Sequence, residues 1–215
     1  MVVLGLSSSD VSQLANGLAL SLKITGASLL LGYPLGILLA LLSDSRILAI
    51  RALGATIVEV GRGLPALVLL YLIYYGLPSA GITLTAFLTS VLALGASTGA
   101  YTSEIFRASF RAIPKAQREA ALALGLSPAR TIRTVLLPQA WRIALPQLVS
   151  FAILVFQASA LCFAVALPEL LSAAYAIGAA TFQYLNVLLI TGAIYLAISL
   201  PASYLANRFG QERDR

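Results

Sequence analysis

The chain has 215 residues, of which 60% are hydrophobic and only 10% are charged, and its formal net charge is +6. Soluble domains are about 45–50% apolar and about 25% charged, so this composition excludes an ordinary water-soluble exterior. The single cysteine, Cys162, excludes an intrachain disulfide scaffold, and the absence of histidine removes the commonest metal ligand. The composition therefore predicts an all-α polytopic membrane protein, with residues 1–215 forming one transmembrane domain.

Five segments are apolar enough to cross a bilayer, which requires about 20 mostly apolar residues each. In the first segment, Lys23 is expected to reach the interface, because a charge near the bilayer centre costs at least about 2.5–3.5 kcal/mol. In the second, Glu59 and Arg62 are three residues apart and are expected to pair on a helix. The five predicted transmembrane helices cover residues 14–42, 55–77, 82–101, 145–167 and 185–206.

Basic residues are distributed unequally between the two sides of these segments. Thirteen of the fourteen Lys and Arg residues lie in or near the loop between the first and second spans, in or near the loop between the third and fourth spans, or after the fifth span. Residues 78–81 and 168–184 contain none. Since positive charge accumulates on the cytoplasmic side, we expect the N-terminus outside, the C-terminus in the cytoplasm and residues 102–144 in a cytoplasmic loop. The first ten residues contain no Lys or Arg, so no cleavable signal peptide is expected.

The loop over residues 102–144 contains a predicted pair of short helices. Pro114 is suited to a helix start, and residues 115–124 (KAQREAALAL) are good helix formers. Gly125 is typical of a left-handed helix stop. We therefore expect a helix that ends in a tight turn at Gly125, with Leu124 and Leu126 available to dock against another surface.

The second helix of the pair is predicted to begin at Ser127, an N-cap residue followed by Pro128. It is expected to run to about Leu136 and to end at Pro138. A helix-turn-helix that binds nucleic acid needs a third helix and a small core, for which the flanking spans leave no room. Two interpretations remain: a structural loop packed on its own bundle, and a docking surface for an aqueous partner, which the small alanines and basic residues favour.

This loop resembles the EAA loop of ABC-transporter permease subunits. The resemblance is carried by Glu119-Ala120-Ala121, Gly125, Ile132 and Leu137-Pro138. The whole chain resembles the polar amino acid (histidine/glutamine-type) permease subfamily. The matching segments are GRGLP at 61–65, GAYTSEIFR at 99–107, IPKAQREAALALG at 113–125, LLPQAWRIALP at 136–146 and the pair Glu169-Leu170, with weaker matches at Ser21-Leu22, Gly32, Gly36 and Tyr195.

The resemblance implies a type I ABC importer permease fold in a bacterial cytoplasmic membrane, and it implies several partners. A separate ATPase subunit would bind ATP and Mg and seat the loop, an extracytoplasmic binding protein would deliver solute, and a second permease copy, identical or different, would complete the path. No G-x-x-x-x-G-K-[ST] motif occurs in the chain, so no enzymatic activity and no cofactor of its own are expected. The implied ATPase-coupling residues are Glu119, Ala120, Ala121 and Gly125, braced by Leu137 and Pro138.

The fourth span departs from the family pattern at the position where a lysine is common. Gln157 occupies that position, and Ser159 retains one of the small polar residues that follow it. Because a cation is missing near the translocation path, two classes of substrate remain possible. One is a polar amino acid, implied by the resemblance, and the other is a different small zwitterionic or amino-acid-derived solute. Candidate path residues are Gln157, Ser159 and Glu169. Their alternative roles are an interhelical hydrogen bond for the first two and a cap of the following helix for Glu169.

Other functional classes have less support from the residues. Secondary transporters and channels usually carry ionisable groups within their spans. Here Lys23 is expected at the interface and Glu59 and Arg62 in the interfacial turn of the second span, so the mid-membrane segments contain none. A membrane enzyme would need a His, Cys or paired-carboxylate cluster. The sequence also leaves open that this chain is a purely structural subunit of an assembly and conducts no solute. The glycine pairs Gly32/Gly36 and Gly95/Gly99 suit either a dimer interface or close packing within one bundle.

Overall fold

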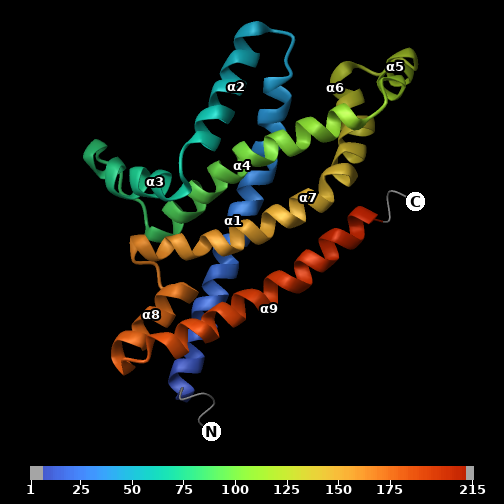
Figure 1. Cartoon of the computed structure of the whole chain (residues 1–215). Helices are drawn as coiled ribbons and strands as arrows, with labels where there is room; N and C mark the ends of the chain where they lie inside the picture. Colours follow the sequence, from blue (N-terminus) through green and yellow to red (C-terminus); the bar gives the residue numbers. More distant parts are fainter. Residues whose placement is uncertain (1–6, 212–215) are drawn as a thin grey trace.

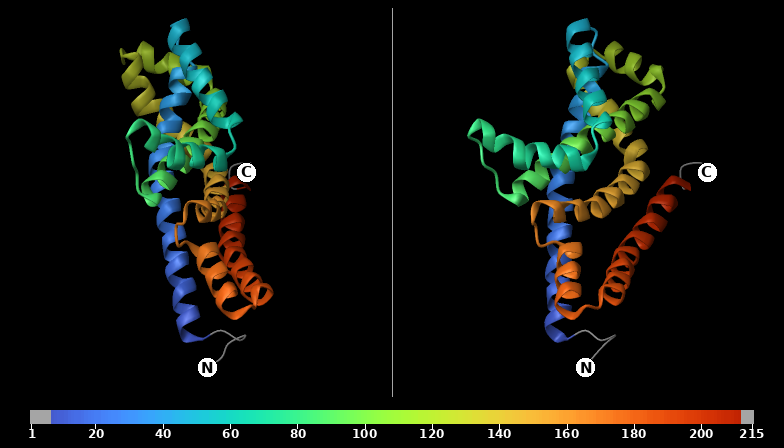
Figure 2. Two further views of the ribbon diagram at one scale, coloured as in Figure 1. Left: turned by 90° about the vertical axis from the view of Figure 1, so that its left-hand side faces the viewer. Right: turned by 60° about the vertical axis from the view of Figure 1, so that its left-hand side comes forward.

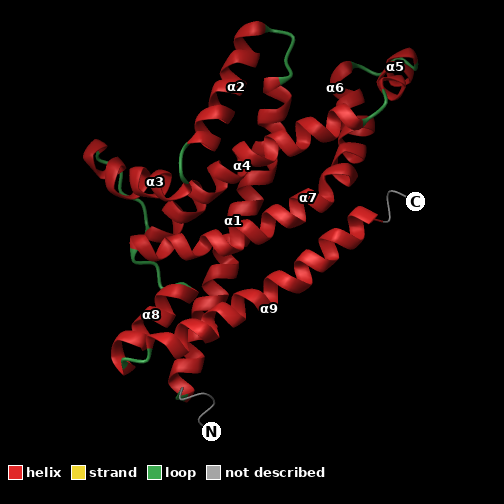
Figure 3. Cartoon of the chain, in the orientation of Figure 1, coloured by secondary structure: helices red, strands yellow, loops and turns green. Residues whose placement is uncertain are grey.

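The computed structural model describes residues 7–211 of the chain. Helices are the only regular elements in that range (Figure 3), as the composition predicted. Four of them are longer than twenty residues and run through the body of the molecule (Figure 1). The helices are α1 (Ser8–Ser43), α2 (Leu48–Gly63), α3 (Ala66–Tyr71), α4 (Ala86–Ala112), α5 (Lys115–Ala123), α6 (Pro128–Thr131), α7 (Leu137–Ala158), α8 (Leu170–Thr181) and α9 (Tyr184–Gln211).

Three helical stretches are long and apolar enough to cross a membrane, and a bent pair formed by α2 and the segment Ala66–Ala80 could be a fourth. Each of the five predicted spans falls mainly on helix. The predicted third span lies on α4, whose many hydroxyl side chains lower its mean hydropathy. The three qualifying stretches are Ser8–Ser43, Pro128–Val165 and Tyr184–Ala206.

Helix α4 is the centre of the bundle, with α1 packed along it and α7 on another side (Figures 1 and 2). The α1 contact is close because glycines line it. A Cβ added to Gly32 would lie 2.5 Å from Thr98 Cβ, and one added to Gly36 would overlap the Thr102 hydroxyl. The small-residue spacing on α1 therefore serves packing within this chain. Most of the hydroxyl side chains of α4 are buried within the bundle.

The expectation of one straight helix over residues 55–77 is wrong, because the chain bends by 100° between α2 and the segment Ala66–Ala80, although the bent pair together is long and apolar enough for one span. Leu64 is extended, with φ −84° and ψ 128°, and Pro65 follows it. The proline ring disfavours helical geometry at the residue before it, so α2 ends there. Helix α3 then runs away from α2 toward the edge of the molecule (Figure 1).

The prediction that Pro138 ends a helix is also wrong. Helix α7 begins at Leu137, so Pro138 occupies its first turn, where a missing N–H is tolerated. The helical path is continuous from Pro128 to Val165, a stretch of 38 residues that includes a π-helical turn at Ile132–Leu136. The wider hydrogen-bonding register of that turn carries the helix past the proline.

Residues 168–184, expected only to connect two spans, contain helix α8. It has 12 residues, too few to cross a bilayer, and it packs against both α1 and α9 (Figure 2). Leu14 of α1, Leu170 and Ile177 of α8, and Val187 of α9 form one buried apolar cluster. The apolar sequence after the acidic Glu169 was a usable signal for a capped helix.

Candidate functional site

The turn between α5 and α6 forms as the sequence predicted. Helix α5 begins directly after Pro114, and Gly125 is left-handed with φ +79°. Ser127 caps α6, its hydroxyl accepting a hydrogen bond of 3.4 Å from the backbone N–H of Arg130. Local sequence alone sets this geometry, because proline, glycine and serine each act on the neighbouring backbone.

Most side chains of α5 are exposed, although five of its nine residues are apolar. Glu119, Ala120 and Gly125 are exposed, whereas Ala121 is only 4% exposed. Leu124 is 84% exposed at the end of the helix. In Figure 1, α5 stands at the tip of the molecule beside α6.

The two residues expected to brace this turn lie at the start of α7. Leu137 is half-buried and Pro138 is exposed, and both follow the π-helical turn Ile132–Leu136 directly. Helix α5 packs on that turn and on α6. The turn therefore connects the α5–α6 surface to a long helix without a break.

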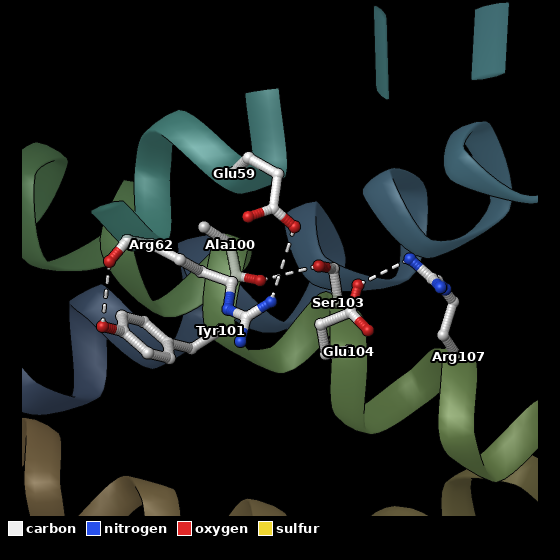
Figure 4. Close-up of polar contacts among 7 residues, drawn as sticks. All are labelled: Glu59, Arg62, Ala100, Tyr101, Ser103, Glu104 and Arg107. Atoms are coloured by element: carbon white, nitrogen blue, oxygen red, sulfur yellow. Dashed lines mark hydrogen bonds and ion pairs between the residues drawn. The ribbon is translucent and has the colours of Figure 1, made fainter. Parts of the chain in front are cut away.

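Two ion pairs form on facing helices (Figure 4), one of them the predicted pair of Glu59 and Arg62. Arg107 donates to Glu104 at 2.7 Å on α4, and Arg62 lies 3.8 Å from Glu59 on α2. The second pair is well exposed and contributes little to stability. The Tyr101 hydroxyl donates to the Arg62 carbonyl at 3.1 Å, which fastens α4 to the end of α2 beside the bend. The GRGLP and GAYTSEIFR segments, distant in sequence, thus pack together.

The three predicted path residues occupy different environments. Gln157 is exposed, and its amide nitrogen donates to the Ser199 hydroxyl of α9 at 3.4 Å. Ser159 is fully buried, and its hydroxyl donates to the Phe156 carbonyl at 2.7 Å. A buried, bonded hydroxyl has a structural use already, whereas the exposed amide retains hydrogen-bonding capacity. Ser199 was not singled out in the sequence, because no spacing signal relates it to Gln157.

Glu169 is fully buried at the N-terminus of α8. Its carboxylate accepts hydrogen bonds from the backbone N–H groups of Leu171 (2.9 Å) and Ser172 (2.8 Å). It also accepts from the hydroxyls of Ser21 on α1 (3.3 Å) and Tyr195 on α9 (3.4 Å). The geometry is that of a helix cap shared by three helices. Sequence analysis found Ser21 and Tyr195 only as weak family matches and gave no sign that they meet.

A cleft of about 440 Å³ opens beside this cap, between the first turns of α1 and α8. Its lining includes polar side chains from one face of α1, namely Ser12, Gln13 and Asn16, together with Ser172 of α8. Among the residues that the structure describes, no group of three His, Cys, Asp or Glu side chains could hold a metal ion. The cleft therefore offers neutral hydrogen-bonding groups.

Comparison with known proteins identifies the family. Residues 32–215 match the family described as the binding-protein-dependent transport system inner membrane component. The arginine transport system permease protein ArtQ of Bacillus subtilis (strain 168) is 36% identical over 192 residues, covering 89% of this chain and 88% of the relative. The L-cystine transport system permease protein TcyB of the same strain is 32% identical over 203 residues, covering 94% and 87%. The glutamate/aspartate import permease protein GltK of Escherichia coli O157:H7 is 31% identical over 202 residues, covering 90% of each chain.

Solved structures agree with these sequence matches. A crystal structure of an amino acid ABC transporter with histidines superposes with a TM-score of 0.84 at 34% identity, covering 94% of each chain. The MetNI methionine ABC transporter in an inward-facing conformation has a TM-score of 0.76 at 20% identity, covering 96% of this chain and 99% of the other, which shows the shared fold alone. The chain therefore belongs to the family of inner membrane components of binding-protein-dependent transport systems.

Proposed function

We propose that the chain is the permease subunit of an ATP-driven ABC importer that carries a polar amino acid across a bacterial cytoplasmic membrane. The observation that carries this proposal is the match along residues 32–215, together with relatives aligned over about nine-tenths of the chain. Their names specify arginine, cystine and glutamate or aspartate, so the side-chain charge of the solute differs among them. What these solutes share is the α-amino acid group.

The proposed topology has five spans, with the N-terminus outside and the C-terminus in the cytoplasm. The spans are α1, the bent pair α2 and α3, α4, α7 and α9. Helix α4 has 27 residues, which at about 1.5 Å per residue is about 40 Å, longer than a hydrocarbon core of about 30 Å. The basic residues concentrate on the side that carries α5 and α6, which supports a cytoplasmic position for that turn.

The α5–α6 turn is the proposed contact with a separate ATPase subunit that binds ATP and Mg. Supporting it are the exposure of α5, the left-handed Gly125 that fixes the turn, and the 84% exposed side chain of Leu124. Closure of the ATPase would push on Glu119, Ala120 and their neighbours. An extracytoplasmic binding protein would deliver the solute to a pair of permease subunits.

Gln157 is the proposed contact with the solute. It is the exposed member of the three candidate residues, whereas Ser159 and Glu169 are buried and hydrogen-bonded within the chain. Its bond to Ser199 is long at 3.4 Å, so a solute oxygen could replace Ser199 as acceptor. A neutral amide at this position suits a zwitterion without selecting one side-chain charge.

The test is to tag the chain, extract it from its native host in mild detergent and identify the copurifying proteins by mass spectrometry. We expect an ATPase with a G-x-x-x-x-G-K-[ST] loop, and a second permease only if the pair is mixed. Reconstituted into proteoliposomes with an extracytoplasmic binding protein, the complex should import labelled arginine, glutamine or glutamate only with ATP. Uptake driven by an ion gradient without ATP would identify a secondary transporter instead.

A further inference from the structure

The buried cap at Glu169 joins three elements that come from distant parts of the chain. Ser21 on α1 is 148 residues away, and Tyr195 on α9 is 26 residues away. Helix α8 itself supplies two backbone donors. Any movement of α8 relative to α1 or α9 must therefore change the hydrogen bonds of this one carboxylate.

The donors are divided unequally between the two carboxylate oxygens. Oε1 accepts one hydrogen bond, from the Ser172 N–H at 2.8 Å. Oε2 is within bonding distance of three donors: the Leu171 N–H at 2.9 Å, the Ser21 hydroxyl at 3.3 Å and the Tyr195 hydroxyl at 3.4 Å. A carboxylate has about four lone-pair sites, two on each oxygen. The Leu171 N–H takes one site on Oε2, so the two hydroxyls compete for the other.

The bond lengths agree with this competition. Hydroxyl-to-oxygen hydrogen bonds usually measure about 2.5–3.0 Å, and both hydroxyl contacts to Glu169 are longer. Neither the Ser21 hydroxyl nor the Tyr195 hydroxyl is within the usual hydrogen-bond length of Glu169 Oε2. If one hydroxyl moves closer, the other loses its place on Oε2.

The two hydroxyls come from different helices, although Tyr195 also packs against the apolar cluster that α1, α8 and α9 share. On one side, the Leu170 N–H donates to Ser21 Oγ at 3.2 Å, and a Cβ on Gly17 would lie 2.9 Å from the Glu169 carbonyl oxygen. On the other side, the Tyr195 ring packs against Phe156 of α7, with ring centroids 5.1 Å apart. The cleft between α1 and α8 leaves space beside the cap. Helix α8 thus contacts both α1 and α9, and α9 also packs on α7.

We propose that Ser21 and Tyr195 are positioning residues for transport, which compete for Glu169 Oε2 and so set whether α8 is held to α1 or to α9. The competition makes α8 a two-state element, which is what coupling between distant sites requires. In the proposed topology α8 lies at the outer side, so the two arrangements alter the outer end of the bundle. This goes beyond the proposed function, which assigns no role to α8.

The test measures the two distances separately with pairs of spin labels in the assembled complex in lipid nanodiscs, without nucleotide. Cys162, the only cysteine, is first replaced by alanine. Labels at Ala15 and Ala179 report the α1–α8 distance, and labels at Ala179 and Ala193 report the α8–α9 distance; all three positions are exposed. Dilution with unlabelled subunits removes signals between two copies.

Tyr195→Phe removes one competitor, so Ser21 should take the freed site. The α8–α9 distance should lengthen and, specifically, the α1–α8 distance should shorten. Ser21→Ala should do the reverse. Tyr204→Phe on α9 and Thr25→Val on α1 are matched controls, since Tyr204 is 70% exposed and the Thr25 hydroxyl donates within its own helix. Neither control should change either distance.

The deciding measurement for each variant is the distance between α8 and the helix that was not changed. Loss of an ordinary structural hydrogen bond would lengthen only the distance to the helix that carries the substitution. If Tyr195→Phe leaves the α1–α8 distance unchanged or longer, the proposal is wrong. Ser21 also accepts the Leu170 N–H, so Ser21→Ala could prevent assembly; Tyr195→Phe then decides alone. A changed ratio of solute imported to ATP hydrolysed in Tyr195→Phe, but not in Tyr204→Phe, would link the competition for Glu169 to transport. The distances need no solute, so they test α8 independently of the importer assignment.

Discussion

Gly125 gives the sharpest test of the proposed ATPase contact, because its backbone is strained for other residues while its surroundings are open. Its φ is +79°, and a Cβ added there would meet nothing within 4 Å. Left-handed backbone costs an L-residue about 1–2 kcal/mol, and β-branched residues tolerate it worst. Gly125→Val therefore changes the backbone preference of the turn without a steric clash.

The expected effect follows from that strain. About 1–2 kcal/mol changes a population ratio by a factor of about 5–30, so the native turn becomes less populated by that factor relative to competing turns. If the turn must be native to contact the ATPase, solute imported per ATP hydrolysed should fall by up to the same factor. The assay is uptake of labelled amino acid alongside phosphate release in proteoliposomes.

Gly125→Asn is the matched control, because asparagine adopts left-handed backbone more readily than any β-branched residue. It adds a side chain of similar size into the same open space. We expect it to stay within a few-fold of the unaltered chain. Equal coupling ratios for the valine and asparagine variants would refute the assignment of a contact that depends on this turn.

Three further outcomes are expected. Gly36→Ala should lower the free energy of unfolding by about 1–3 kcal/mol by overpacking against Thr102, whereas Gly26→Ala on the same helix, with nothing within 4 Å, should not; thermal unfolding in detergent compares them. Leu124→Ser should reduce recovery of the ATPase in a pull-down without changing the melting temperature of the permease. Gln157→Ala should raise KM for uptake more than it lowers kcat, and Gln157→Lys should shift preference toward glutamate over arginine; unchanged selectivity in both would remove Gln157 from the path.

Elements set by neighbouring residues could be predicted from the sequence. Gly125 and Ser127 act on their own backbone, and both form the stop and the cap expected of them. The ion pair between Glu59 and Arg62 depends only on helical spacing and also forms. Leu64 and Pro65 carried a similar local signal for the bend, but the apolar run around them favoured one straight span.

Features that depend on packing could not be predicted in this way. The helix that continues past Pro138 includes a π-helical turn that contacts α5 and α6. The convergence of Ser21 and Tyr195 on Glu169 joins segments up to 148 residues apart, and no periodicity within either segment encodes it. The central position of α4 in the bundle, which its small polar residues fit, was likewise not visible in the sequence of residues 82–101.

The unbroken helical path from Pro128 to Val165 has a mechanical consequence. Its 38 residues would measure about 57 Å at about 1.5 Å per residue, and Gln157 lies near the far end. The path nevertheless contains the π-helical turn Ile132–Leu136, Pro138 and Pro146, and such positions are where helices bend. A push received beside the α5–α6 turn would therefore reach Gln157 through a helix that flexes at these positions, and the flexibility of α7 would set how much of the displacement arrives there.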